Sequence, residues 1–229
     1  HTISLAANLK EALMNEPMLT QEYQRVNVLI TTPHFTTVPV AAFQKEDIGA
    51  VYQFVFPKDK AQHISYNVLR RSGIAIVFGL DRNIHQLLLD DFPRARFYAS
   101  ASTLIEFFGE NSLFGKGRKM YVYLHEKEMT VYAFEQGRML FVNTFPVMSV
   151  ADMQYYVLNV WKEQAFDQVD DSLLIVGDKE SLCVELSEKI KYFLQQVSVF
   201  DRSEDFKDKL TQGNTLIPYD LQTLLICGF

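Results

Sequence analysis

The stretch MYVYLH at residues 120–125 begins the part of the chain that decides its fold. Its aromatic and apolar side chains are typical of a buried strand. Two similar segments follow at residues 128–134 and 138–145, and Gln136-Gly137 between them tolerates the positive φ of a tight turn. We therefore predict an antiparallel meander of three strands.

Helices and strands alternate after the meander. Ser149 and Asp152 match the S-x-x-D signal at the start of a helix. The predicted elements are a helix, a strand, a second helix and a second strand, at residues 149–165, 173–176, 179–191 and 197–200. Strands that are separated by helices tend to pair in parallel. The run from Lys119 to Phe200 therefore predicts an α/β lobe with a mixed sheet, of the ribonuclease H-like or actin-like type.

The first half of the chain repeats part of this order. Its predicted elements are helix, strand, helix, two strands, helix, strand and helix, at residues 3–15, 25–31, 39–52, 63–70, 73–80, 82–91, 95–99 and 101–108. Helix 39–52 corresponds to helix 179–191 in this comparison, and a final helix near 218–225 completes the second copy. The opening meander has no counterpart, so we expect its strands to lie N-terminal to His1.

Residues 109–118 are the predicted linker between two lobes, because three glycines with Asn and Ser disfavour regular structure. We assign residues 1–114 to a first lobe that is incomplete at its N-terminus and residues 115–229 to a second lobe. A hairpin near residues 62–80 is inserted in the first lobe. The predicted fold class is α/β, with two actin-like lobes and mixed sheets.

Composition argues against several classes of protein. The 229 residues carry a net charge of −6, which disfavours nonspecific binding to nucleic acid. The two cysteines, Cys183 and Cys227, form no CxxC pair, which indicates a reduced environment. The apolar run at residues 73–80 is far shorter than the roughly 20 residues that cross a bilayer, and no export signal is visible. We expect a cytoplasmic protein.

A resemblance to known proteins rests on five short segments. They are Asp91-Phe92-Pro93, MYVYLH at 120–125, FVNTF at 141–145, DMQYY at 152–156 and LIVGD at 174–178. In these segments the chain resembles an uncharacterised bacterial family of unknown function with an actin-like ATPase fold. Its organisation is similar to the cytoplasmic scaffold of type II secretion and to the actin-like protein of type IV pilus assembly. The resemblance implies an actin-like, ribonuclease H-like fold and a protein partner.

The resemblance also implies where a nucleotide would bind. Actin-like ATPases use a D-x-G turn after the first strand of each lobe, because a phosphate needs the close approach of backbone amides. Here that turn is His125-Glu126-Lys127-Glu128, without glycine, and Gly177 beside Asp178 replaces the usual glycine pair. We predict that these turns are degenerate and that Gly177 is a structural strand end. A two-metal nuclease is also disfavoured, because residues 120–124 contain no acidic side chain.

The remaining candidates for chemistry lack a motif. His34, His63, His85 and His125 have no metal-ligand spacing, and Cys183 is predicted to be a buried structural thiol. We therefore assign no catalytic, cofactor-binding or metal-binding residues.

A cluster of basic residues, GKGRK at 115–119 with Arg94 and Arg96, has two interpretations. It is a solvated linker, which we favour, or it binds a phosphate group or an acidic partner.

Three functions remain open from the sequence. The favoured hypothesis is a binding or scaffold protein with an actin-like fold that does not hydrolyse ATP and acts through a protein partner. The alternative is an ATP-dependent small-molecule kinase or ATPase whose site is completed by residues N-terminal to His1. The third is nucleic-acid binding through the basic cluster, which the net charge disfavours.

Overall fold

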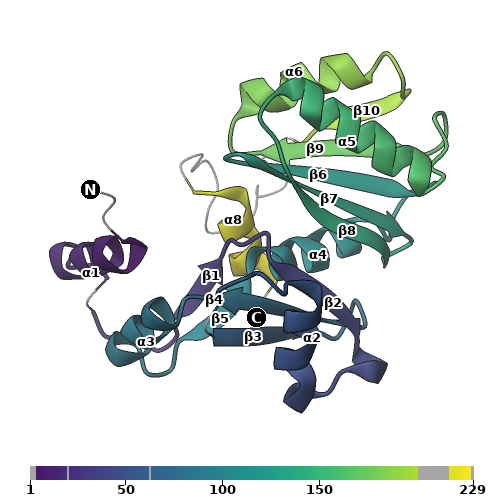
Figure 1. Cartoon of the computed structure of the whole chain (residues 1–229). Helices are drawn as coiled ribbons and strands as arrows, with labels where there is room; N and C mark the ends of the chain where they lie inside the picture. Colours follow the sequence, from purple (N-terminus) through teal and green to yellow (C-terminus); the bar gives the residue numbers. More distant parts are fainter. Residues whose placement is uncertain (1–3, 20, 62, 201–216, 228–229) are drawn as a thin grey trace. The chain divides into compact units, whose positions relative to one another are not determined.

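The computed structural model describes residues 4–19, 21–61, 63–200 and 217–227 (Figure 1). The chain forms two compact units, residues 1–102 and 103–229. Their boundary falls near the start of α4 (Ser100–Asn111), so the first three residues of the predicted linker are helical. The helix continues this far because the backbone N–H of Ser112 still donates to the carbonyl of Phe108 at 2.9 Å. The assignment of lobes around residue 114 stays a prediction.

The second unit contains a five-stranded mixed sheet. Its strands are β6 (Lys119–His125), β7 (Glu128–Glu135), β8 (Arg138–Pro146), β9 (Ser172–Gly177) and β10 (Gln196–Val199), in the order β10-β9-β6-β7-β8. β6, β7 and β8 pair antiparallel, whereas β9 pairs in parallel with both β6 and β10. The predicted meander and the predicted mixed sheet are confirmed.

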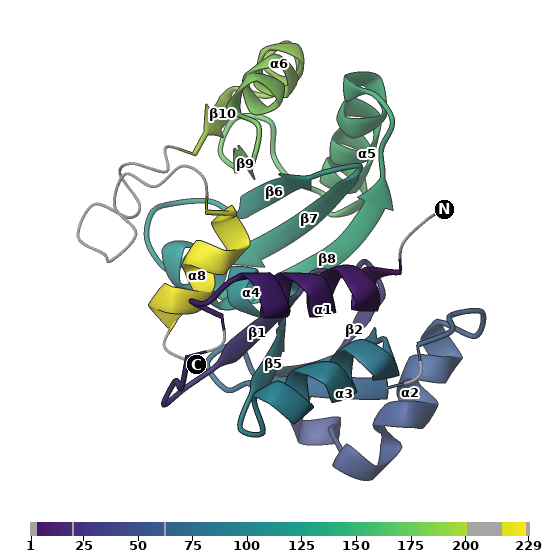
Figure 2. The same ribbon diagram turned by 90° about the vertical axis from the view of Figure 1, so that its left-hand side faces the viewer.

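Helices cover both faces of this sheet (Figures 1 and 2). The helices besides α4 are α5 (Val150–Glu163), α6 (Glu180–Ile190) and α8 (Tyr219–Cys227). α5 and α6 lie on one face, and α4 and α8 lie on the other. Because side chains alternate along a strand, Met120 and Val122 enter the core with α5 and α6, whereas Tyr121 stacks on Phe108 of α4 at 4.3 Å. One strand therefore serves two cores.

The start of α5 is fixed by a capping box. The Oγ of Ser149 accepts a hydrogen bond from the N–H of Asp152 at 3.2 Å, and the Asp152 carboxylate accepts one from the N–H of Ser149 at 2.9 Å. A further bond from the Met148 N–H to this carboxylate is the main reason why the pKa of Asp152 lies below its usual value. These local bonds explain why this helix start is predictable from sequence.

The first unit contains two smaller sheets. Its elements are α1 (Leu5–Asn15), β1 (Asn27–Ile30), β2 (Phe35–Pro39), 3₁₀ turns at Val40–Ala42 and Lys45–Asp47, α2 (Ile48–Val55), β3 (His63–Leu69), β4 (Ile74–Leu80), α3 (Arg82–Asp91) and β5 (Arg96–Ala99). β1 pairs in parallel with β5, and β2, β4 and β3 form an antiparallel sheet.

Two predictions about helix 39–52 are wrong: the residue at which it begins and its correspondence to the helix at residues 179–191. The predicted helix 39–52 is preceded by an unpredicted strand, β2, and regular helix begins only at Ile48. The β-branched run Thr36-Thr37-Val38 favours a strand, and the N–H of Val40 still donates to the carbonyl of Gly73 at 2.9 Å. The insertion is therefore a three-stranded sheet with α2 rather than a hairpin alone. The helix that corresponds to α6 is α3, which packs on α1 and directly precedes β5.

Asn67 joins the two sheets of the first unit. Its side-chain amide is 8% exposed and donates to the carbonyl of Phe97 at 2.8 Å. Its Oδ1 accepts from the N–H of Ala99 at 2.9 Å and from the Oγ of Ser102 at 2.8 Å. One side chain of β3 thus bonds the backbone groups on the side of β5 that does not pair with β1.

Replacing Asn67 with Leu is expected to destabilise the protein by about 2–4 kcal/mol, because buried groups on β5 lose their partners. The thermal unfolding midpoint should fall by roughly 5–15 °C for a chain of this size. Asn143→Leu, at an exposed position of β8, is the matched control and should shift the midpoint little. Equal shifts in the two variants would contradict this role of Asn67.

Candidate functional site

The carboxyl ends of β6 and β9 form the first candidate site. These neighbouring parallel strands end at His125 and Gly177. Ligands of α/β sheets bind at the carboxyl ends of parallel strands, and the resemblance implies a phosphate turn here. The arrangement of the side chains at this end therefore bears directly on function.

A histidine–aspartate pair joins the two strand ends. The Nδ1 of His125 lies 2.8 Å from the Oδ2 of Asp178, and both side chains are partly buried. The hydroxyl of Tyr123 lies 3.5 Å from the same oxygen. The other oxygen, Oδ1, accepts a hydrogen bond from the N–H of Tyr219 at the start of α8, at 3.3 Å. The Asp178 carboxylate thus holds β6 and α8 together.

Gly177 lies in close contact with its own fold. A Cβ atom at this position would lie 2.8 Å from the carbonyl oxygen of Leu124, 2.9 Å from its Cβ and 3.0 Å from the Sγ of Cys183. Cys183 itself is buried in α6 with an exposure of 1%. Glycine is therefore needed here so that β9 can approach β6 and α6, which supports the interpretation of Gly177 as a structural strand end.

The turn that follows β6 is tight and carries two carboxylates. Glu126 has a φ of 50°, in the left-handed region where glycine is usual. The carbonyl of Lys127 accepts a hydrogen bond from the N–H of Val147 at 2.9 Å. Glu126 is exposed, and Glu128 at the start of β7 is half-buried. The turn thus places carboxylate side chains and a left-handed Glu126 where the resemblance implies a glycine.

Two residues of the basic cluster, Arg118 and Lys119, make contacts inside the second unit. The Arg118 guanidinium pairs with Asp171, at 2.9 Å from Nη2 to Oδ2, and lies 4.4 Å above the ring of Phe166. It also donates to the carbonyls of Gln164 and Ala165. Arg118 therefore closes the amino-terminal end of the sheet and is not part of a solvated linker.

Lys119 of the cluster has a contact of its own in the second unit. The Nζ of Lys119 donates to the carbonyl of Asn111 at 2.8 Å, and burial lowers the pKa of this lysine. Arg94 and Arg96 belong to the first unit.

The four histidines in the described part of the chain lie in three pairs. His34 lies 3.2 Å from Asp59, and His125 pairs with Asp178. The rings of His63 and His85 stack with their centroids 3.7 Å apart. Burial lowers the pKa of both stacked histidines, and the neighbouring His85 adds to the shift of His63. Among the described residues, no three His, Cys, Asp or Glu side chains gather as a metal site.

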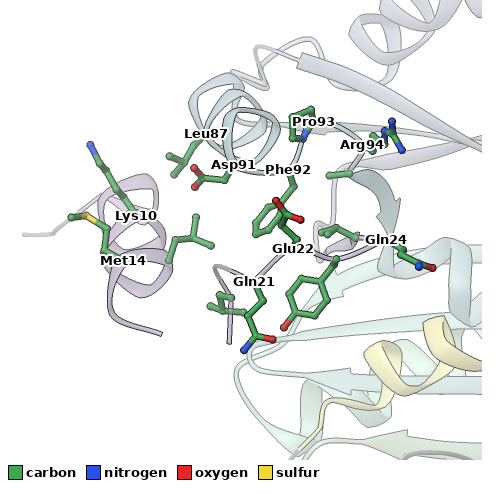
Figure 3. Close-up of a pocket in the computed structure, with 15 residues that line it drawn as sticks. Lys10, Met14, Gln21, Glu22, Gln24, Leu87, Asp91, Phe92, Pro93 and Arg94 are labelled. Carbon is green, nitrogen blue, oxygen red and sulfur yellow. The ribbon is translucent and has the colours of Figure 1, made fainter. Parts of the chain in front are cut away.

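A cavity of about 800 Å³ in the first unit was not predicted from the sequence (Figure 3). We call it the α1–α3 cavity. Its walls come from α1, the segment before β1, the end of α3 and the turn before β5, and they include Lys10, Glu22, Asp91, Phe92 and Arg94. The only sequence signal was Asp91-Phe92-Pro93, which carried the resemblance. The cavity lies at the amino-terminal ends of β1 and β5, opposite to the usual ligand end of such a sheet.

Comparison with known proteins identifies the family. The model of a family described as "Protein of unknown function (DUF3822)" matches residues 1–197. The chain belongs to this family. A crystal structure from Bacteroides thetaiotaomicron, of a protein with an actin-like ATPase fold and unknown function, is 31% identical with a TM-score of 0.86. The match covers 99% of this chain and 82% of that one. The family resemblance and the predicted α/β actin-like fold are confirmed.

A more distant likeness is to the PilM–PilN type IV pilus biogenesis complex. It has a TM-score of 0.52 at 8% identity and covers 97% of this chain and 83% of that one, so it shows similarity of fold. No curated protein matched the chain significantly. None of the helices in the described ranges has the length and apolarity needed to cross a membrane.

Gly177→Ala is expected to destabilise the protein by about 1–3 kcal/mol, because the added methyl group overpacks the β6–β9 contact. The control is Gly49→Ala in α2, where a Cβ would meet nothing within 4 Å. That change should be neutral or slightly stabilising, because alanine favours a helix. Thermal unfolding measures both effects. A neutral Gly177→Ala variant would show that the close approach is not required.

The stacked histidines predict a loss of stability in acid. Their pKa values are lowered in the folded protein, so the unfolded chain binds protons more readily. Their contribution is full above about pH 6.5 and is lost as the pH falls towards their folded pKa values. His63→Phe keeps an aromatic ring beside His85 and should weaken this dependence. The unfolding midpoint is measured between pH 5 and pH 8 for the original protein and for His63→Phe. If it falls equally in both as the pH is lowered, the stacked pair is not the cause of the loss of stability.

Proposed function

We propose that this protein is a binding or scaffold module that keeps an actin-like fold without turning over ATP. The observation that carries the proposal is the His125–Asp178 pair, which joins the strand ends where an actin-like ATPase would receive phosphates. A phosphate site needs free backbone N–H groups and positive charge. Here the backbone N–H of Asp178 is already directed to the carbonyl of Leu124 at 3.3 Å.

The charges at this end also support the proposal. The side chains of Glu126 and Asp178 stand beside the strand ends, with Lys127 as the cation of the turn. A triphosphate placed there would be repelled by these carboxylates, and Lys127 is the cation that the turn itself offers to bind it. The sheet remains a rigid frame, because both faces of the second unit are packed with buried side chains.

The distant likeness to the PilM–PilN complex supports a protein partner as the ligand. That solved structure is an assembly of an actin-like protein with a second protein. A frame whose described phosphate turn lacks glycine can still present surfaces to such a partner. We expect the protein to lie in the cytoplasm, because its two cysteines form no CxxC pair in the sequence.

The proposal predicts that magnesium-ATP leaves the thermal unfolding midpoint unchanged. A ligand at about 100 times its dissociation constant stabilises a protein by about 2.7 kcal/mol. For this chain length that corresponds to a rise of roughly 5–10 °C. Magnesium alone and ATP with a chelator are the controls. A rise of this size that needs both ATP and magnesium would replace the proposal with a kinase or an ATPase.

A further inference from the structure

The edge of β1 has no strand beside it among the described residues. β1 pairs with β5 alone, whereas β9, its counterpart in the second unit, lies between β10 and β6. The N–H of Arg96 donates to the carbonyl of Val26 at 3.0 Å. Because backbone groups alternate along a parallel strand, the amides of Val28 and Ile30 face β5 and that of Leu29 faces the open edge.

Burial differs sharply between the two counterparts. In β9, Leu173 and Ile175 are fully buried, as parallel strands in α/β sheets usually are. Every residue of β1 is only half-buried, although Val28, Leu29 and Ile30 are equally apolar. Part of the surface that is covered around β9 is therefore uncovered around β1.

The helices beside these strands show the same contrast. α5 buries Met153, Val157, Val160 and Trp161, whereas among the residues of α1 only Leu13 is buried. Leu5 and Met14 of α1 are 69% and 74% exposed. In the first unit α1 and β1 are therefore less covered than their counterparts α5 and β9 in the second unit.

The two units differ in the surroundings of the segments that precede β9 and β1. In the second unit, Arg118 directly precedes β6 and fills the space beside the loop between α5 and β9, over Phe166 and against Asp171. In the first unit the segment before β1 borders an open cavity whose walls include Phe92 and the carboxylates of Glu22 and Asp91 (Figure 3). The walls of this cavity thus hold an aromatic ring and carboxylates, together with the cations Lys10 and Arg94.

We propose that the open edge of β1 docks a parallel strand, the first strand of a meander like β6–β8, carried by polypeptide N-terminal to residue 1. The second unit supports this occupant, because there β6 pairs in parallel with β9 at the corresponding edge. The Bacteroides relative also extends beyond the 82% of it that this chain covers. A strand in this position receives the free backbone groups of β1, and its flanking residues cover α1 and enter the α1–α3 cavity. This inference is independent of the proposed function.

Hydrogen exchange resolved at single residues tests the proposal. The Leu29 amide should exchange rapidly in residues 1–229 alone and slowly in the longer natural protein. Leu174, whose amide faces β6, is the matched control and should be protected in both. A rapidly exchanging Leu29 in the longer protein would overturn the proposal, and so would a natural protein that begins at residue 1. Protection that grows with the concentration of residues 1–229 would indicate a second copy instead.

Proline substitution provides a second test. Leu29→Pro removes an N–H that faces away from β5, where the described residues place no strand, whereas Leu29→Ala removes side-chain contacts alone. The two variants should unfold at similar temperatures in residues 1–229. In the longer protein the proline variant should unfold several degrees below the alanine variant. An equal midpoint for both variants in the longer protein would contradict a strand beside β1.

Discussion

The parallel pairing of β6 with β9 is the interaction on which the second unit depends. It brings together two segments 53 residues apart, and a charged contact joins them at each end. Arg118 meets Asp171 where the strands begin, and His125 meets Asp178 where they end. Between these contacts Gly177 allows the strands to approach closely. The meander, α5 and α6 all pack on this pair.

The same pairing accounts for the proposed function. A nucleotide site at the carboxyl end would need glycine and free amides, but Asp178 is used to hold His125 and the N–H of Tyr219. The contact that stabilises the fold occupies the position where the chemistry of an actin-like ATPase would take place. In the first unit the corresponding strand, β1, pairs with one strand among the described residues, whereas β9 pairs with two.

The sequence was sufficient for elements with local signals. The strands of the meander and α5 follow from alternation and from the capping pair Ser149 and Asp152, which act within a few residues. The prediction of a helix at residues 39–52 was wrong, because Pro39 is also typical of the first residue of a helix. Pro39 is in fact the last residue of β2, an edge strand that tolerates a residue without an N–H.

The candidate site was predictable only in part. The absence of glycine from the turn after β6 was visible in the sequence, and so was the isolation of Gly177. The partners of Arg118 and His125 were not, because those contacts join residues more than 50 positions apart and depend on the pairing of β6 with β9. The α1–α3 cavity depends likewise on the packing of α1 against α3, which no local pattern encodes.

The central claim is that the protein's own side chains close the carboxyl end of the β6–β9 pair. The most direct measurement is an amide ¹H–¹⁵N spectrum that follows Glu126, Lys127 and Asp178 during titration with magnesium-ATP. These three signals should stay unchanged up to millimolar nucleotide. Saturable shifts centred on them would show that the turn receives phosphate and would contradict this claim.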